Sequence, residues 1–159
     1  MHYVSLNPTT NREIQNYDSW DALQLEQALL KAHSAQQEWA QTPFILRAEM
    51  LRDAASQLRV RRDRYATIIT REMGKPLREA RAEVEKCAAC CDYYAQHAEE
   101  FLRAETVESD ARNSYVAHYP LGVLLAVMPW NFPFWQVFRA AAPALMAGNA
   151  VVLKHAANV

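Results

Sequence analysis

An asparagine between prolines and aromatic residues follows the longest aliphatic run of the chain. The segment Pro129-Trp130-Asn131-Phe132-Pro133 comes directly after residues 121–128, a run of strand length. In an open α/β sheet, ligands bind at the carboxyl ends of strands, next to a helix N-terminus. The Asn131 amide is suited there to stabilise negative charge developing on a carbonyl oxygen. The residues alone also allow a structural role, in which Asn131 is the N-cap of the next helix.

The helix expected after this segment carries an arginine on the same face as two aromatic side chains. Phe132, Trp135, Gln136 and Arg139 are spaced i, i+3, i+4 and i+7, which places them on one face. A guanidinium group binds a carboxylate through a bidentate charge-assisted pair. Arg139 therefore suits an acidic ligand, and pairing with a protein carboxylate is the alternative.

Helices must form most of the first hundred residues. The first 17 residues have polar turn chemistry and predict an extended arm with a turn. Apolar residues then recur at three- and four-residue steps. This spacing predicts helices from about Ser19 (as N-cap) to 41, from Pro43 to about 58, over 65–73 and from Leu77 to about Leu102. Gly74 and Pro76 are typical punctuation at the end of the third helix.

Strand patterns follow this helical layer. Residues 105–108 and 114–119 flank a turn-like segment and predict a hairpin with a five-residue loop. The aliphatic run 121–128 predicts a strand covered on both faces, followed by a helix from Phe132 or Pro133 to about Ala147 and a short strand at 150–154. This order predicts a right-handed parallel βαβ unit. Because one such unit cannot cover its own faces, we expect a fragment of a larger fold.

These motifs resemble, in order and spacing, those of the aldehyde dehydrogenase superfamily. The matching segments are 129–133, 143–145, 148–149 and 151–154, with Glu72-Met73-Gly74-Lys75-Pro76, Ala82-Glu83-Val84 and Asn7-Pro8 to Ile14 upstream. The resemblance covers essentially the whole chain. It implies an α/β fold with an N-terminal helical layer and the start of a Rossmann-like parallel sheet, incomplete in this chain. The implied parts are the arm and helical layer (1–104), an oligomerisation hairpin (105–120) and the first βαβ unit of the NAD(P)-binding domain (121–159).

The resemblance also implies a catalytic role and a substrate. Asn131 donates its side-chain hydrogen bond to the aldehyde oxygen as this becomes a tetrahedral oxyanion. The face with Phe132, Trp135, Gln136 and Arg139 lines the aldehyde tunnel. Together with Arg139, this predicts a short aldehyde with a distal acid group, succinate semialdehyde being the leading case.

A cofactor site is implied at the strand ends. Lys154 is expected to bond the adenosine ribose of NAD or NADP, while Met128, Pro129 and Trp130 border the nicotinamide. Considered alone, Lys154 could also be a solvated strand-end lysine. Members of the family often have an acidic residue three positions after this lysine, and here that position is Ala157. Since an acidic group would disfavour the 2′-phosphate of NADP, we expect both cofactors to be used.

The nucleophilic cysteine and the general-base glutamate of the family are expected beyond residue 159. Cys87, Cys90 and Cys91 lie on a predicted amphipathic helix and favour a packing role. They lack the spacing of a zinc site, and no metal is expected. Glu83 and Glu85 lie in the wrong region for the general base. We therefore expect the chain to be inactive alone. The alternatives are a truncated, non-catalytic product that assembles with intact subunits and a CoA-acylating relative.

The composition excludes several other classes. Hydrophobic residues make up 51%, charged residues 22%, and the net charge is -1, as in a soluble globular protein without a nucleic-acid footprint. The run 59–64 contains an Asp among its arginines and predicts a solvated helix junction. No signal peptide or membrane-spanning run is evident, so we expect a cytoplasmic protein. The hairpin at 105–120 favours a homodimer or homotetramer of the complete protein.

Overall fold

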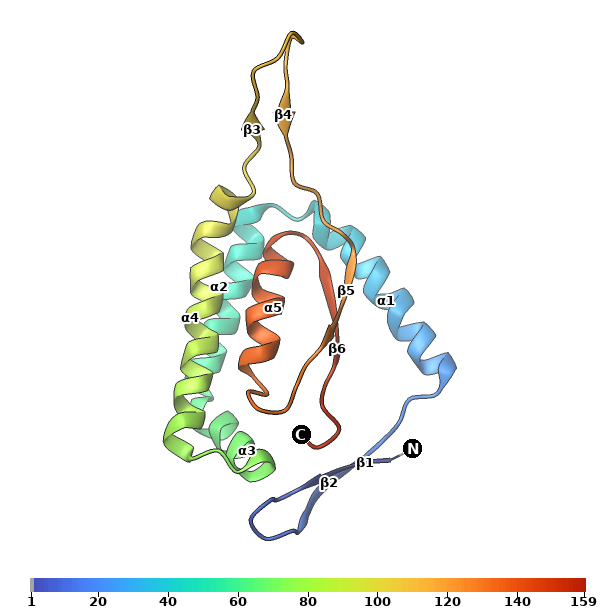
Figure 1. The fold of residues 1–159 in the computed structure, drawn as a ribbon, viewed down its shortest axis with the longest axis vertical. Helices are drawn as coiled ribbons and strands as arrows, with labels where there is room; N and C mark the ends of the chain where they lie inside the picture. The colour runs from blue at the N-terminus through green and yellow to red at the C-terminus, as the bar shows by residue number, and fades with distance from the viewer. Residues whose placement is uncertain (1) are drawn as a thin grey trace.

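Four helices occupy residues 22–101 in the computed structural model, which describes residues 2–159 (Figure 1). They are α1 (Ala22–Gln41), α2 (Phe44–Val60), α3 (Arg62–Met73) and α4 (Leu77–Phe101). The prediction of four helices is confirmed. Gly74 ends α3 in the left-handed conformation, with φ of 77°, where a residue without a Cβ avoids strain.

The first helix begins later than predicted. Its N-cap is Asp21, not Ser19. The Asp21 carboxylate accepts a hydrogen bond from the Gln24 N–H at 2.7 Å, and the Gln24 side chain accepts one from the Asp21 N–H at 2.9 Å. This reciprocal capping box satisfies two N–H groups and fixes the helix start at Asp21. The apolar pattern therefore predicted the cap two residues too early.

The core of the helical layer is built from small side chains on α4 and its neighbours. Ala55, Ala66 and Ala80 are fully buried, as are Cys87 and Cys91 on α4. The small residues allow α2, α3 and α5 (Trp135–Met146) to pack against α4. The buried or half-buried packing role predicted for the cysteines is confirmed, since Cys90 is half-buried against the same core.

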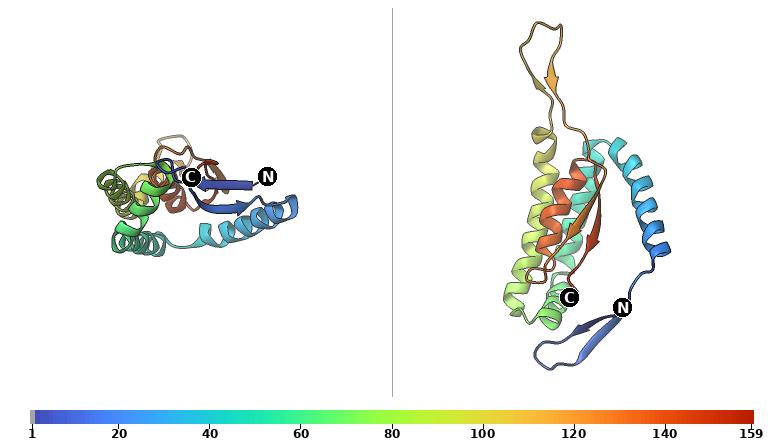
Figure 2. Two further views of the ribbon diagram at one scale, coloured as in Figure 1. Left: turned by 90° about the horizontal axis from the view of Figure 1, so that it is seen from below. Right: turned by 45° about the vertical axis from the view of Figure 1, so that its right-hand side comes forward.

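A two-stranded parallel sheet forms the second layer. Strand β5 (Val123–Val127) pairs with β6 (Ala150–Lys154) in continuous register, and α5 connects them. The parallel βαβ unit is therefore confirmed. Figures 1 and 2 show both strands between α5 on one side and α1 on the other.

The strand β5 is not covered on both faces, contrary to the prediction. Ala126 is buried, but the side chains that alternate with it, Leu125 and Val127, are 69% and 67% exposed. Within residues 2–159, α1 and α5 cover the sheet only in part. A continuous aliphatic run indicates a strand that is buried in its complete fold, and it does not say which segments supply the cover.

Two antiparallel hairpins lie outside these layers. The strands β1 (His2–Leu6) and β2 (Glu13–Asp18) form the predicted N-terminal arm. The predicted second hairpin is present, but β3 (Glu105–Thr106) and β4 (Tyr115–Val116) have two residues each and are shorter than expected. This hairpin extends away from the helical layer (Figure 1).

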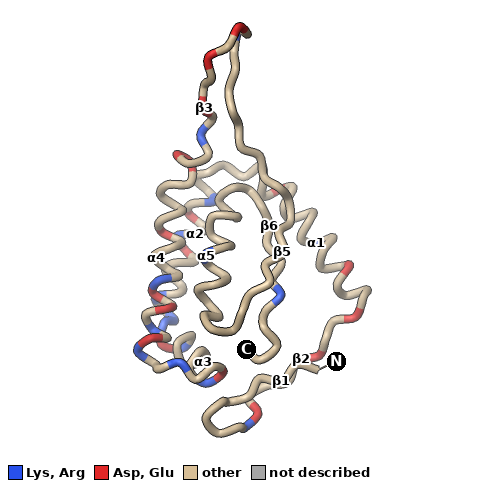
Figure 3. Tube along the Cα trace, viewed as in Figure 1, with Lys and Arg blue, Asp and Glu red and all other residues tan. Residues whose placement is uncertain are grey.

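Charges of both signs are interspersed over the helical layer (Figure 3). The arginine-rich run lies at the junction of α2 and α3, as predicted, and two of its residues form ion pairs with α4. Arg59 contacts Glu85 at 2.8 Å and Asp63 contacts Arg81 at 2.9 Å. Among the helices of residues 2–159, none is both long enough and apolar enough to cross a membrane.

Candidate active site

Asn131 lies in the turn between the end of β5 and the start of α5. The predicted helix start at Phe132 or Pro133 is wrong, because α5 begins at Trp135 and its N-cap is Phe134. No side chain at the N-cap position makes a capping bond, so the interpretation of Asn131 as the helix cap is also wrong. Within residues 2–159 the exposed Asn131 amide forms no hydrogen bond. The amide group is therefore available to a ligand.

The cap of α5 comes from another helix. The Glu83 carboxylate, on α4, accepts hydrogen bonds from the backbone N–H groups of Phe134 and Trp135 at 2.9 and 3.0 Å. These N–H groups belong to the helix start, where intrahelical partners are missing and negative charge is favoured. Glu83 therefore replaces the local N-cap that α5 lacks.

Lys75 contacts the same turn from the segment between α3 and α4. Its ammonium group pairs with the second Glu83 oxygen and donates to the Asn131 carbonyl oxygen at 3.2 Å. It also lies 3.6 Å from the centre of the Phe132 ring. The side chains of Lys75 and Glu83 are 7% and 1% exposed. The turn that carries Asn131 is thus bonded to a buried ion pair.

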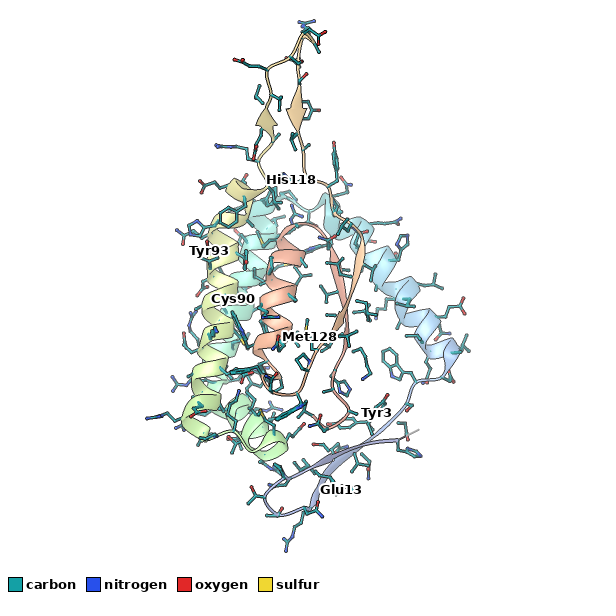
Figure 4. All side chains as sticks on the ribbon, in the orientation of Figure 1. Tyr3, Glu13, Cys90, Tyr93, His118 and Met128 are labelled. Carbon is teal, nitrogen blue, oxygen red and sulfur yellow. The ribbon has the colours of Figure 1, made fainter. Side chains whose placement is uncertain are left out.

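Trp135 and Arg139 lie together in a cleft between α4 and α5. The cleft has a volume of about 420 Å³ and is lined by Lys86, Ala89, Cys90, Tyr93, Tyr94, Trp135 and Arg139. The Lys86 ammonium lies 3.9 Å from the centre of the Trp135 ring. Figure 4 shows Cys90 and Tyr93 on the α4 wall. Within residues 2–159 no carboxylate forms an ion pair with Arg139. The cleft therefore presents the charges of Lys86 and Arg139 beside aromatic side chains.

The four residues predicted to share one helix face are not all brought together. Phe132 precedes α5 and lies beneath Lys75 instead. Gln136 lines a different groove, beside the exposed side of β5, and Arg139 lines both this groove and the cleft with Trp135. The Phe132 carbonyl oxygen still accepts the Gln136 N–H at 3.0 Å, but the Phe132 ring contacts Lys75 and lines neither the groove nor the cleft, so the shared face does not extend to Phe132.

The residues predicted to bind the cofactor gather at the carboxyl ends of the two strands. Met128 follows β5 (Figure 4), and its N–H donates to the Lys154 carbonyl at 3.0 Å. Met128 and Pro129 border a largely apolar cavity of about 190 Å³, and its other walls come from α3, from residues 133–137 and from residues 153–159. Trp130 follows Pro129 in the chain, is half-exposed and does not line the cavity.

Lys154 and Ala157 lie on the exposed side of the same edge. The Lys154 ammonium donates to the His155 carbonyl at 2.6 Å, and Ala157 lies in the turn that follows. An ammonium donor suits hydroxyl or phosphate oxygens, and an apolar cavity suits a planar ring. These groups therefore fit a dinucleotide bound across the strand ends.

The three cysteines are poor candidates for a nucleophile. Burial raises the pKa of Cys91 to about 12, and it also raises the pKa of Cys87 and Cys90. Because a thiolate is the reactive form, these thiols are largely unreactive at neutral pH.

Sequence reasoning missed Lys75, Glu83 and Lys86 as residues of the site. Lys75 enters the sequence analysis only within a motif of the helical layer, and Glu83 only within such a motif and as a residue in the wrong region for the general base. Their segments carried a signal, since Glu72–Pro76 and 82–84 match the family pattern, but nothing in the sequence connects them with the turn at Asn131.

The fold and the strand-end cavity define an α/β protein of the kind that binds ligands at the carboxyl ends of parallel strands. The model of the aldehyde dehydrogenase family matches residues 1–159, and the chain belongs to this family. The resemblance of the motifs and the fold class are thereby confirmed.

Relatives with assigned names are similar over the same residues. The chain is 50% identical to a Synechocystis sp. protein named "Probable succinate-semialdehyde dehydrogenase [NADP(+)]". The matched region covers 100% of this chain and 35% of that protein. It is 45% identical to the succinate semialdehyde dehydrogenase Sad of Escherichia coli, named with NAD(P)+, over 99% of the chain and 34% of the relative.

A solved structure has the same arrangement. Succinic semialdehyde dehydrogenase from Streptococcus pyogenes, in complex with NADP+, matches with a TM-score of 0.93 and 39% identity, over 98% of this chain and 34% of that one. The chain thus spans about a third of the length of the relatives that it matches.

Proposed function

We propose that the chain is the N-terminal part of an NAD(P)-dependent aldehyde dehydrogenase that oxidises a short aldehyde with a distal carboxylate. Succinate semialdehyde is the leading substrate. The observation that carries this proposal is the exposed Asn131 amide, which forms no hydrogen bond within residues 2–159 and lies on a turn bonded to Lys75 and Glu83. Such an amide is available for a developing oxyanion at the end of a parallel strand.

The role of Asn131 follows from the chemistry of aldehyde oxidation. Attack by a thiolate converts the planar carbonyl into a tetrahedral centre whose oxygen carries negative charge. The Asn131 N–H donor stabilises this charge more than it stabilises the neutral aldehyde, and it therefore lowers the barrier. The nicotinamide group, when bound, supplies the hydride acceptor.

Two cations favour an acidic substrate. Lys86 and Arg139 line the cleft that Trp135 also lines. Arg139 can hold a carboxylate through two hydrogen bonds, and Lys86 adds a second positive charge near the same aromatic wall. The names of the relatives from Synechocystis sp. and E. coli support the same substrate class.

We assign the strand-end groups to cofactor binding. Lys154 bonds the ribose, and Met128, Pro129 and Trp130 border the nicotinamide. Ala157 lacks the charge that would repel a 2′-phosphate, so both NAD and NADP are accepted. The cofactors in the names of the relatives support this assignment.

The nucleophile and the general base belong, in this proposal, to a longer polypeptide. The exposed Leu125 and Val127 side chains are consistent with further strands and helices that pack against β5. The buried thiols of α4 do not supply a nucleophile, and the 159 residues alone have no turnover.

The test is a comparison of the full-length polypeptide with the isolated chain. We expect NAD(P)H formation from succinate semialdehyde by the full-length protein and none by the 159-residue chain. Aldehyde-dependent turnover by the purified chain, free of full-length enzyme, would contradict the assignment of the nucleophile. If the full-length protein oxidised none of the aldehydes tested, acidic or neutral, the proposed function would be contradicted.

A further inference from the structure

We propose that Glu83 and Lys75 are positioning residues that set the orientation of the Asn131 amide for catalysis. The inference rests on the proposed function of Asn131. Neither side chain is assigned a contact with the substrate. Each acts through the turn that connects β5 with α5, and the pair links the helical layer to the site.

The turn depends on Glu83 because α5 has no cap of its own. One Glu83 oxygen accepts from the N–H groups of both Phe134 and Trp135. The carboxylate is almost fully buried, so these part-buried N–H groups have no easy replacement by water. With this anchor, the first turn of α5 has a fixed position relative to α4.

Lys75 fixes the other end of the same turn. It donates to the carbonyl oxygen of Asn131 itself and lies against the Phe132 ring. Its charge also compensates the buried charge of Glu83, which would otherwise be costly to bury. Lys75 thereby holds the Asn131 backbone directly, through the Asn131 carbonyl oxygen. Glu83 holds it indirectly, through the N–H group of Phe134.

Catalysis by an oxyanion donor depends strongly on its position. A donor must reach the oxygen of the tetrahedral centre at about 2.7–3.1 Å, and a misplacement of about 1 Å can cost 10²-fold in rate. The Asn131 amide, which forms no hydrogen bond within residues 2–159, is placed by its backbone. The Lys75 bond to the Asn131 carbonyl and the two Glu83 bonds to Phe134 and Trp135 therefore determine how well the amide meets the oxyanion.

The decisive variant is Glu83→Gln in the full-length enzyme, assayed with succinate semialdehyde. The amide keeps an oxygen acceptor but loses the charge and the ion pair with Lys75. We expect kcat to fall about 10–100-fold while KM changes less than about threefold, as for an interaction realised in the transition state. The matched control is Glu85→Gln, which removes a charge from the same helix and breaks the exposed pair with Arg59. Its kcat should stay within about twofold of the parent.

A double-mutant cycle separates positioning from general structure. In an Asn131→Ala background, Glu83→Gln should lower kcat less than about threefold, because the donor that it orients is gone. An equal loss in both backgrounds, or an effect on KM alone, would overturn the inference. If Asn131→Ala by itself leaves kcat unchanged, the proposed function fails instead, so the two failures are distinguishable.

Hydrogen exchange gives a second measurement that needs no turnover. We expect Lys75→Met in the full-length protein to speed exchange in residues 130–136 and to leave residues 88–101 of α4 unchanged. This measurement decides the question if Glu83→Gln does not fold. Unchanged exchange in the turn, or faster exchange throughout α4, would overturn the inference.

Discussion

The ammonium group of Lys86 lies 3.9 Å from the centre of the Trp135 ring, so α4 places a cation against the aromatic wall of the cleft on α5. A cation over the face of an indole is attracted by the ring electrons. Arg139 lines the same cleft. A ligand between the two helices therefore meets two positive charges, which favours a carboxylate.

Replacing these cations should change selectivity between acidic and neutral aldehydes. For Lys86→Met or Arg139→Ala in the full-length enzyme, we expect KM for succinate semialdehyde to rise about tenfold or more, since each loses about 1.5–3 kcal/mol of charged interaction. KM for a neutral aldehyde of similar length should change little. Steady-state kinetics with both substrates measures the difference.

The matched control is Lys31→Met, which removes a lysine from the exposed surface of α1. It should leave both KM values unchanged. Equal effects of Arg139→Ala on acidic and neutral aldehydes would show that Arg139 does not recognise the substrate carboxylate.

Cofactor choice should depend on Ala157. The parent enzyme is expected to use both NAD and NADP. In Ala157→Glu, the carboxylate should repel the 2′-phosphate and raise KM for NADP about tenfold or more while NAD is retained. Initial rates with each cofactor test this, with Ala157→Gln as the uncharged control. A strong preference of the parent for NAD would count against the argument.

The buried thiols of α4 should be protected from alkylation. Because burial raises their pKa, we expect iodoacetamide at neutral pH to leave Cys87 and Cys91 unmodified in the folded protein and to modify both in urea. Mass spectrometry of the peptides gives the measurement. Rapid modification of either thiol in the folded state would contradict the assigned packing.

The same burial predicts an effect of pH on stability. The pKa of Cys91 rises from 9.0 to about 12 on folding, so above pH 9 the unfolded state loses a proton that the folded state keeps. The contribution of the Cys91 thiol to the free energy of unfolding is therefore fully present below the unfolded pKa of 9.0 and is lost as the pH rises toward 12. Urea unfolding should show a smaller alkaline loss for Cys91→Ala than for the parent, and equal losses would contradict this.

The hairpin of β3 and β4 should mediate assembly. It extends away from the helical layer and exposes Val107, Tyr115 and Val116, and unpaired strand edges favour pairing with another chain. We expect the full-length protein to be a dimer or tetramer by light scattering at micromolar concentration, and Val116→Lys to weaken it. A sharp monomer of the parent protein would contradict this role.

Local features could be predicted well from the sequence. Gly74 and Pro76 mark the end of α3 and the start of α4 because their backbone preferences act within a few residues. The parallel βαβ unit followed from the length of two aliphatic runs with one helix between them. The pattern of apolar residues locates a helix end only to within about a turn, which is why the cap expected at Ser19 lies at Asp21.

The contacts that complete the site could not be predicted in this way. Glu83 caps a helix that begins 52 positions later in the chain, and no local rule connects the two. Its presence also explains why Asn131 is not the cap, since the N–H groups at the start of α5 already have an acceptor. The exposure of Leu125 likewise depends on which segments cover β5.

The most direct test of the account is kcat of the full-length Asn131→Ala enzyme with succinate semialdehyde. Loss of an oxyanion donor predicts a decrease of about 10²–10³-fold, with KM nearly unchanged and the fold intact by circular dichroism. A kcat within about threefold of the parent would show that the Asn131 amide does not stabilise the transition state, and the proposed mechanism would be wrong.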